Sequence, residues 1–300
     1  MNNKKTMAVL SALGAQFIFG FSFMFTKIAL DYATPMTVIA DRYIVAFITL
    51  TLVMLFKKIK IKSSKNISKL ILMALFQPVL YFLCESYGIK YTTSGFSSVM
   101  ISLIPVVSIF GGMLFLREYP SFLQYLFTII SVLGVVFMVH NGKVDGTVTA
   151  LGIVLLFGAV ISSVAYNVLS RKISSEFTAF ERTYAMMLTG LVVFLAISFF
   201  GNINNPVNIV VNFKNPVYTT AILYLGVLSS VVAFLLLNYA NTYLPVSKTT
   251  VFANITTLVS VSAGIIFLDE KLNMLTVISA VMIIAGTWGV QMTEQRKTVE

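Results

Sequence analysis

Uncharged polar side chains are scarce within the long apolar runs of this sequence, and they are the groups that could bind a solute. In lipid, a buried polar group is costly unless it is paired or faces a water-filled cavity. An amide has several hydrogen-bonding positions, whereas many Ser hydroxyls bond their own helix. Interhelical bonding is the alternative role for each amide, and packing or the membrane interface is the alternative for the tyrosine. The candidates for binding a solute are Gln16, Gln77, Ser102, Ser163, Tyr166 and Asn254.

Glu85 is the one acid well inside an apolar run, which makes it the candidate for taking up and releasing a proton. It lies about six residues beyond the centre of its run, or roughly 9 Å along a helix. That depth leaves an alternative, in which the carboxylate reaches the outer membrane interface.

The other charged residues at the ends of the apolar runs have simpler expected roles. Arg42 and Arg182 directly follow Asp41 and Glu181, so we expect these arginines to anchor and orient their helices at the interface. Lys27 can extend its ammonium toward the membrane surface or pair with the acid four residues later.

Motifs for catalysis or nucleotide hydrolysis do not occur. The sequence has no GxxxxGK[ST] phosphate-binding loop, no Ser/His/Asp set and no pair of acids in the middle of an apolar run. The single His140 and the single Cys84 argue against a His-rich metal site and an internal disulfide. We therefore expect no enzyme activity, no cofactor and no metal, with energy supplied by a gradient or a partner.

Membrane helices must position these side chains. The 300 residues are 58% hydrophobic and 11% charged, with a mean hydropathy of +0.91, whereas a soluble domain is about 25% charged. A bilayer core about 30 Å thick needs roughly 20 apolar residues per helix. The long runs, which do not alternate with period two, predict an all-α integral membrane protein with ten transmembrane helices at about 7–30, 35–56, 69–88, 95–116, 121–140, 147–170, 178–200, 217–240, 246–268 and 273–292.

The positive charge is gathered in the connections between these runs. The net charge is +10, and the main cluster, from Lys57 to Lys69, lies in one short connection, so we expect no nucleic-acid partner. Cytoplasmic loops carry such an excess of Lys and Arg. With an even number of spans, the bias predicts a multi-pass protein of the cytoplasmic (plasma) membrane with both termini cytoplasmic.

The sequence also repeats itself. A shift of 152 positions superposes many unusual residues, among them Tyr87 on Tyr239, Glu118 on Glu270 and Gly134 on Gly286. The predicted halves are residues 1–142 and 143–300, and each holds five spans, so the second half is inverted relative to the first. Inverted repeats are typical of transporters, because two similar halves can exchange conformations around a site near the midplane.

In these same segments the chain resembles the EamA-like ten-helix permeases of the drug/metabolite transporter (DMT) superfamily. The resemblance covers nearly the whole chain and rests on Lys90-Tyr91-Thr92-Thr93, on "SLIPVVSIFGGMLFLRE" and on "GIIFLDEKLNMLTVISAVMIIAGTWG". It implies a secondary permease, often an exporter of amino acids or similar metabolites. Thr257 stands where the family pattern repeats Pro105, so the bend expected in the fourth helix has no proline to repeat it in the ninth.

We therefore predict a secondary transporter that moves a small metabolite, an amino acid or a related compound, out of the cell by alternating access. Its expected partners are the solute, the lipid bilayer and a coupling ion such as a proton. A membrane channel or signalling protein is the alternative, although the sequence shows no conspicuous selectivity motif. It carries no signal for an oligomeric state.

Overall fold

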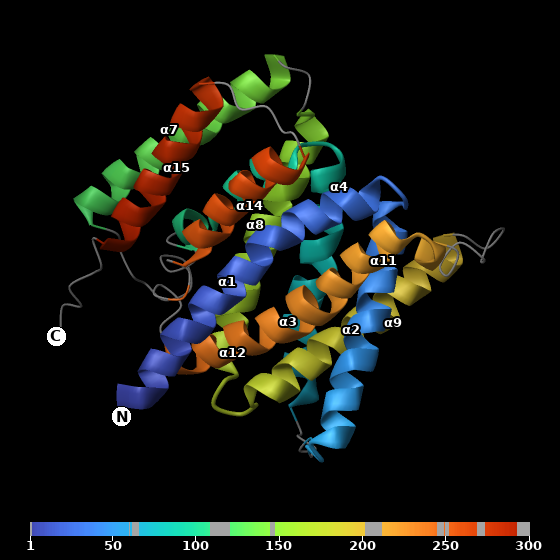
Figure 1. The fold of residues 1–300 in the computed structure, drawn as a ribbon. Coiled ribbons are helices and arrows are strands. Elements are labelled where there is room, and N and C mark those ends of the chain that lie inside the picture. The colour runs from blue at the N-terminus through green and yellow to red at the C-terminus, as the bar shows by residue number, and fades with distance from the viewer. Residues whose placement is uncertain are drawn as a thin grey trace.

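The computed structural model describes residues 2–59, 61, 66–108, 121–144, 148–201, 212–244, 249, 252–268 and 274–292. All regular elements in these ranges are helices (Figure 1). They are α1 (Asn2–Leu30), α2 (Pro35–Phe56), α3 (Ile67–Ala74), η1 (Leu75–Leu80), α4 (Tyr81–Lys90), α5 (Ser94–Ile101), α7 (Phe122–Val144), α8 (Ala150–Lys172), α9 (Ala179–Gly201), η2 (Asn212–Lys214), α11 (Pro216–Leu223), η3 (Tyr224–Val232), α12 (Ala233–Tyr243), α14 (Ala253–Leu268) and α15 (Met274–Met292).

These helices account for the predicted membrane spans. Six are long and apolar enough to cross a bilayer: Lys4–Leu30, Pro35–Phe56, Ile67–Lys90, Ala150–Lys172, Ala179–Phe200 and Pro216–Tyr243. Four shorter apolar helices lie at the remaining predicted places, at Ser94–Ser108, Phe122–Phe137, Ala253–Leu268 and Val277–Gly289. The predicted spans 95–116 and 246–268 include residues outside the described ranges. The all-helical membrane fold expected from the apolar runs is confirmed.

Helices begin where the sequence supplies a capping oxygen. Thr34 accepts a hydrogen bond from the Thr37 amide at 3.3 Å, and Pro35 then starts α2 with its φ already helical. Asn215 plays the same part before α11, accepting from the Val217 amide at 2.9 Å. The turn residues of the sequence therefore place the helix starts correctly.

The third and eighth spans contain an interruption that the sequence reading did not anticipate. Each has a π-helical segment, η1 at Leu75–Leu80 and η3 at Tyr224–Val232, and the two overlap under the shift of 152 positions. In η1 the cause is Pro78, which has no amide hydrogen, and the preceding Gln77 adopts φ −141° and ψ 111°. Such segments are frequent at functional sites.

The expected difference between the fourth and ninth spans is present. The fourth is broken at Ser102 and Leu103, just before Pro105, whereas α14 runs unbroken from Ala253 to Leu268 through Thr257. The Thr257 hydroxyl instead donates to the carbonyl of Ser98 at 3.2 Å and thereby links α14 to α5.

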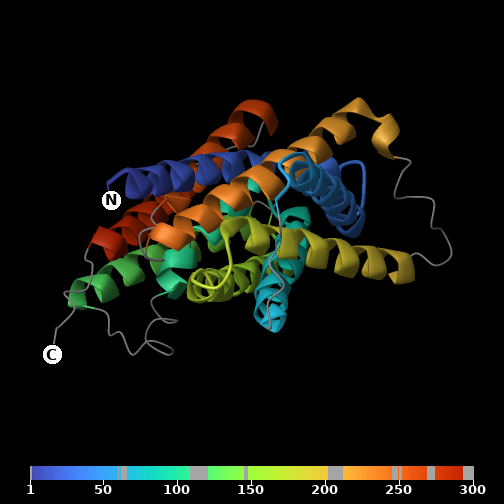
Figure 2. The ribbon, with the colours of Figure 1, turned by 90° about the horizontal axis from the view of Figure 1, so that it is seen from below.

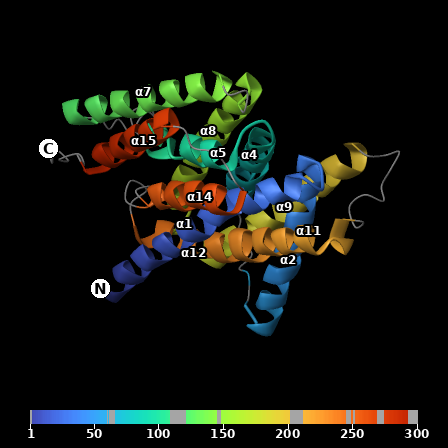
Figure 3. The same ribbon diagram turned by 45° about the horizontal axis from the view of Figure 1, so that its top comes forward.

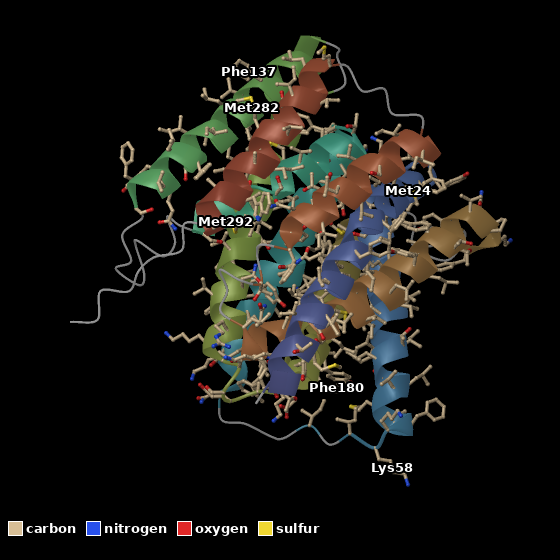
Figure 4. The ribbon with its side chains drawn as sticks, turned by 60° about the vertical axis from the view of Figure 1, so that its left-hand side comes forward. Met24, Lys58, Phe137, Phe180, Met282 and Met292 are labelled. Carbon is tan, nitrogen blue, oxygen red and sulfur yellow. The ribbon has the colours of Figure 1, made fainter. Side chains whose placement is uncertain are left out.

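The last helices of the two halves, α7 and α15, lie side by side at one edge of the molecule (Figures 1 and 3). A Cβ atom on Gly286 would lie 2.6 Å from the Ser131 amide nitrogen, and one on Gly134 would lie 2.8 Å from Ile283. These glycines are therefore needed for the close approach of the two helices. Figure 4 shows Phe137 and Met282 on this helix pair.

The ends of the spans sort into two sides. Lys58, Phe180 and the first turns of α1 lie toward one end of the molecule, and Met24 lies toward the other (Figure 4). The beginning of α1 and the end of α15 lie on the same side in Figures 1 and 2. This arrangement agrees with an even number of spans.

Candidate functional site

A cavity lies between six spans, which come from both halves of the chain. Its lining side chains belong to α1, η1, α4, the end of α5, α8, α12 and α14. The space in which the centre of a water molecule fits is about 60 Å³, so the cavity has room for a few waters. A metabolite would therefore enter only if the walls moved apart. The polar residues at the cavity are Gln16, Ser22, Gln77, Tyr81, Glu85, Ser163, Asn167, Thr249 and Thr256.

The cavity brings together four of the residues predicted from the sequence: Gln16, Gln77, Ser163 and Glu85. The Gln16 side-chain oxygen accepts from the Thr256 hydroxyl at 2.7 Å, so this amide also joins α1 to α14. The Gln77 side-chain oxygen is buried and accepts no hydrogen bond from the described residues. Ser163 is 5% exposed on α8. Binding of a solute by these residues remains a prediction.

The other three predicted residues lie outside the described cavity lining. The Ser102 hydroxyl donates to the carbonyl of Val99 at 2.6 Å, within its own helix. The Tyr166 hydroxyl donates to the Asn238 side-chain oxygen at 3.0 Å, and the ring is fully buried. Asn254 has a buried side-chain oxygen without a described donor. In this conformation Tyr166 and Ser102 thus make internal contacts.

Glu85 is buried, with 4% of its surface exposed, rather than at the interface. Its Oε1 accepts a hydrogen bond from the Tyr81 hydroxyl at 3.0 Å. Helix α8 packs closely on α4 one turn away, where a Cβ on Gly88 would lie 2.8 Å from Leu156. Distance from the centre of one helix therefore says little about exposure when a neighbouring helix covers that turn.

Arg42 is also buried, so the expectation that it anchors its helix at the interface does not describe its contacts. Its Nε donates to the Ser230 hydroxyl at 2.7 Å and its Nη2 to the Ser229 hydroxyl at 2.9 Å, both on η3. The guanidinium carbon lies 4.0 Å from the ring centre of Phe82, which lines the cavity. Asp41 does not share these contacts, because successive helix residues do not face each other.

Arg182 has a different environment, although it holds the equivalent place in the second half. It is fully buried, and its Nη1 donates to the Ser170 carbonyl at 2.9 Å and hydroxyl at 2.7 Å. Its Nη2 donates to the Asn238 carbonyl at 2.8 Å and to the Thr242 hydroxyl. Arg182 therefore joins α8, α9 and α12.

Two further cations bind helix ends. The Lys27 ammonium donates to the carbonyls of Ile89 at 3.2 Å and Thr92 at 2.7 Å, at the end of α4, rather than only reaching the surface. Arg171 donates to two carbonyls at the end of α12, at 2.9 and 2.6 Å, those of Asn241 and Thr242. Cations are favourable at the carboxyl ends of helices.

One ion pair occurs among the described residues, between Lys69 in the first turn of α3 and Glu176 in the connection after α8, at 2.5 Å. Asn66 also donates to the Glu176 carboxylate, at 2.7 Å. The hydrogen bond from Lys69 lowers the pKa of Glu176 below its usual value. No cluster of three or more His, Cys, Asp or Glu residues suited to a metal occurs in the described ranges.

Several cavity residues were not among the sequence candidates, and helix spacing offered a signal for some of them. Asn167 follows Ser163 by four residues, so the two lie on one face of α8. Phe19 and Phe23 follow Gln16 by three and seven residues on α1 and share its face in the same way. Phe82 precedes Glu85 by three residues and shares its face of α4 in the same way, whereas Phe234 has no candidate residue at such a spacing.

Comparisons with known proteins agree with this architecture. The chain is 33% identical over 302 residues to "Uncharacterized transporter YcxC" of Bacillus subtilis (strain 168), covering 99% of this chain and 97% of that protein. It is 25% identical over 273 residues to an "Uncharacterized transporter" of Archaeoglobus fulgidus, covering 90% and 93%. A solved crystal structure superposes with a TM-score of 0.68 at 12% identity, covering 94% of this chain and 97% of that one, and shows the shared fold.

The model of the EamA-like transporter family matches the chain twice, at residues 6–140 and 150–292. The two matches agree with two five-helix halves, as the repeat predicted. The chain belongs to the EamA-like transporter family and is a multi-pass membrane transporter.

Proposed function

We propose that this protein is a secondary transporter that carries a small metabolite through the central cavity by alternating access. The observation that supports the proposal best is the symmetry of the cavity wall. Four pairs of lining residues differ by the repeat shift of 152 positions: Phe82 and Phe234, Glu85 and Leu237, Ile101 and Ala253, and Ile104 and Thr256. A site on the axis that relates two inverted halves is reached from opposite sides as the halves exchange conformations.

The small volume of the cavity is consistent with a state that is closed on both sides. The π-helical segments in the third and eighth spans lie at equivalent places in the two halves, and both contribute to or adjoin the cavity wall. A local change in helix winding there would move the two walls in turn. We propose these segments as the places where the spans bend.

The solute is proposed to be an amino acid or a related compound, and net transport to be outward. Support comes from the resemblance to EamA-like permeases, which implies export of amino acids or similar metabolites, and from the amide and hydroxyl groups of the cavity. We propose the cytoplasmic membrane as the location, with both termini cytoplasmic, because the Lys57 to Lys69 cluster marks that side. In a Cys84→Ala background, Lys58→Cys should be labelled from the cytoplasm and Tyr32→Cys from outside.

Glu85 is the proposed site of proton coupling, since it is the described acid at the cavity. Replacing it by Gln keeps the shape but removes the titrating group. Transport by Glu85→Gln should therefore lose its pH dependence while the protein remains folded. An unchanged pH profile would exclude Glu85 as the coupling residue.

Flux into liposomes that contain the purified protein tests the transport function. Across a panel of radiolabelled amino acids and their analogues, a carrier should show saturating uptake of one solute and faster exchange when that solute is present on the other side. Uptake that rises linearly with concentration, without such exchange, would favour the channel alternative. Substitutions at Glu85 or Phe82, which line the cavity, should slow the flux while the protein remains folded.

A further inference from the structure

We infer that the cavity recognises its solute through a protonated amine, with the Glu85 carboxylate as the acceptor and aromatic rings around the apolar body. This inference rests on the proposed transport function and names the chemical class of the solute. It is carried by the charge of the cavity wall, by acceptor oxygens without donors, and by the arrangement of the rings.

The charge of the wall favours a cation. Glu85 is the only charged side chain among the described residues that line the cavity. A buried carboxylate needs a compensating charge or several hydrogen bonds. Arg42 is near, but no carboxylate oxygen of the described residues lies within 4.0 Å of its guanidinium. Arg42 attracts the Glu85 carboxylate from a longer distance, and a cationic solute would supply the direct contact that the carboxylate lacks.

The hydrogen-bonding state of the wall favours a solute rich in donors. Glu85 Oε1 accepts from the Tyr81 hydroxyl at 3.0 Å, and Oε2 accepts nothing from the described residues. The side-chain oxygen of Gln77, another wall residue that is 5% exposed, also has no described donor. A primary ammonium carries three N–H donors and no acceptor, which suits such a wall.

Aromatic rings close the cavity around these oxygens. Phe19 and Phe234 meet edge to face with ring centres 5.1 Å apart, and Phe82 meets Phe234 at 6.2 Å. The faces of such rings attract cations and pack against apolar groups. Phe82 already has one cation on its face, the guanidinium of Arg42 at 4.0 Å.

Arg42 is the strongest argument for an anionic solute instead. Its guanidinium, however, is bonded to the hydroxyls of Ser229 and Ser230 and is not part of the described cavity wall. Phe82, which lines the cavity, lies against that guanidinium, whereas the Glu85 carboxylate is itself part of the wall. The anion therefore serves as the opposing probe.

Binding of three probes of similar size tests the inference on the purified full-length protein by isothermal titration calorimetry. The probes are phenethylammonium, neutral 2-phenylethanol and anionic 3-phenylpropanoate. We expect phenethylammonium to bind about 10- to 100-fold more tightly than the alcohol, as for a charge-assisted hydrogen bond. Equal affinities, tighter binding of the anion, or no binding of the amine would overturn the inference.

Variants test whether the preference for the amine depends on the Glu85 carboxylate. Glu85→Gln should lower the affinity for phenethylammonium to about that for 2-phenylethanol, whereas Glu85→Asp should retain part of the preference. Glu176→Gln, which alters a carboxylate outside the spans, is the matched control and should bind like the parent. The melting temperature of each variant reports folding, and Glu85→Asp supplies the comparison if the amide variant does not fold. A Glu85→Gln protein that keeps the amine preference would overturn the inference.

The outcome is separable from the test of transport. Saturating flux of a solute without an amine, together with no amine preference in binding, overturns the amine site and leaves the carrier function in place. Amine binding that depends on Glu85, with no flux of any amine or amino acid, supports the amine site and contradicts the carrier function.

Discussion

Arg42 and Arg182 occupy equivalent places near the starts of α2 and α9, yet their contacts give them different roles. Arg182 makes charge-assisted hydrogen bonds to Ser170, Asn238 and Thr242, and so connects three helices away from the described cavity wall. Arg42 bonds two hydroxyls of η3 and stacks on Phe82 at the cavity. Both halves of the chain therefore keep a buried arginine at this place, but the arginine has a different role in each half.

The acids that precede the two arginines differ in the same way. Glu181 accepts from the Thr178 amide at 2.8 Å, and Thr178 accepts from the Glu181 amide at 3.2 Å, which closes a capping box at the start of α9. Asp41 accepts from the Tyr218 hydroxyl at 2.6 Å and has a second oxygen without a described partner. The acid before Arg182 is thus part of a closed capping box, whereas the acid before Arg42 keeps a buried oxygen without a described donor.

Arg182→Met should have the largest effect on stability. It removes the guanidinium donors from the carbonyls of Ser170 and Asn238 and from the hydroxyls of Ser170 and Thr242 in a buried site, and we expect a loss of about 3–4 kcal/mol in the free energy of unfolding. The measurement is the unfolding midpoint in detergent, compared with Arg42→Met. If Arg42→Met were the less stable of the two, the assignment of the structural role to Arg182 would be wrong.

Arg42→Met should affect transport more than stability. Loss of two hydroxyl bonds and one cation–π contact should cost about 1–2 kcal/mol of stability. Because η3 and Phe82 lose their common partner, the maximal flux should fall about tenfold, by the conversion of about 1.4 kcal/mol to a factor of ten. Arg42→Lys keeps the charge and should recover part of the flux. Normal flux with Arg42→Met would remove Arg42 from the transport cycle.

Tyr166→Phe tests whether Tyr166 belongs to the structural network around Arg182 or to the solute site. The hydroxyl donates to Asn238, which belongs to the Arg182 network, so its loss should cost about 1 kcal/mol of stability. Affinity for the transported solute should stay within about twofold. A clear loss of affinity with an unchanged melting temperature would show instead that Tyr166 binds solute, as the sequence predicted.

Glu176→Gln should have the smallest effect, and the effect should depend on pH. The pKa of Glu176 is lowered in the folded protein by its bond to Lys69, so the bond stabilises the fold above the usual pKa of glutamate, about 4.3. That contribution is lost as the pH falls through the lowered pKa. The melting temperature of Glu176→Gln should therefore be slightly below that of the parent at pH 7 and should approach it near pH 3. A constant difference would show that the charge of Glu176 is not the cause.

The residues of the candidate site were partly predictable. Gln16, Gln77, Ser163 and Glu85 stood out because polar groups in apolar runs are rare, and the structure places them at one cavity. Ser102 and Asn254 differ by the repeat shift of 152 positions, but the lining positions next to them are Ile101 and Ala253. A shift between repeats fixes depth along a helix, and the direction in which each side chain points depends on how that helix is rotated against its neighbours.

The membrane-spanning helices follow from the amino-acid sequence alone, because in lipid a backbone can satisfy its hydrogen bonds only internally and long apolar runs leave no other choice. The two halves follow from it as well, since a fixed shift aligns their unusual residues. The burial of Glu85 and Arg42, the departure of η1 and η3 from α-helical winding and the linking role of Arg182 appear only in the folded chain. These outcomes depend on which neighbouring helix covers each turn, and that depends on contacts between residues far apart in the chain.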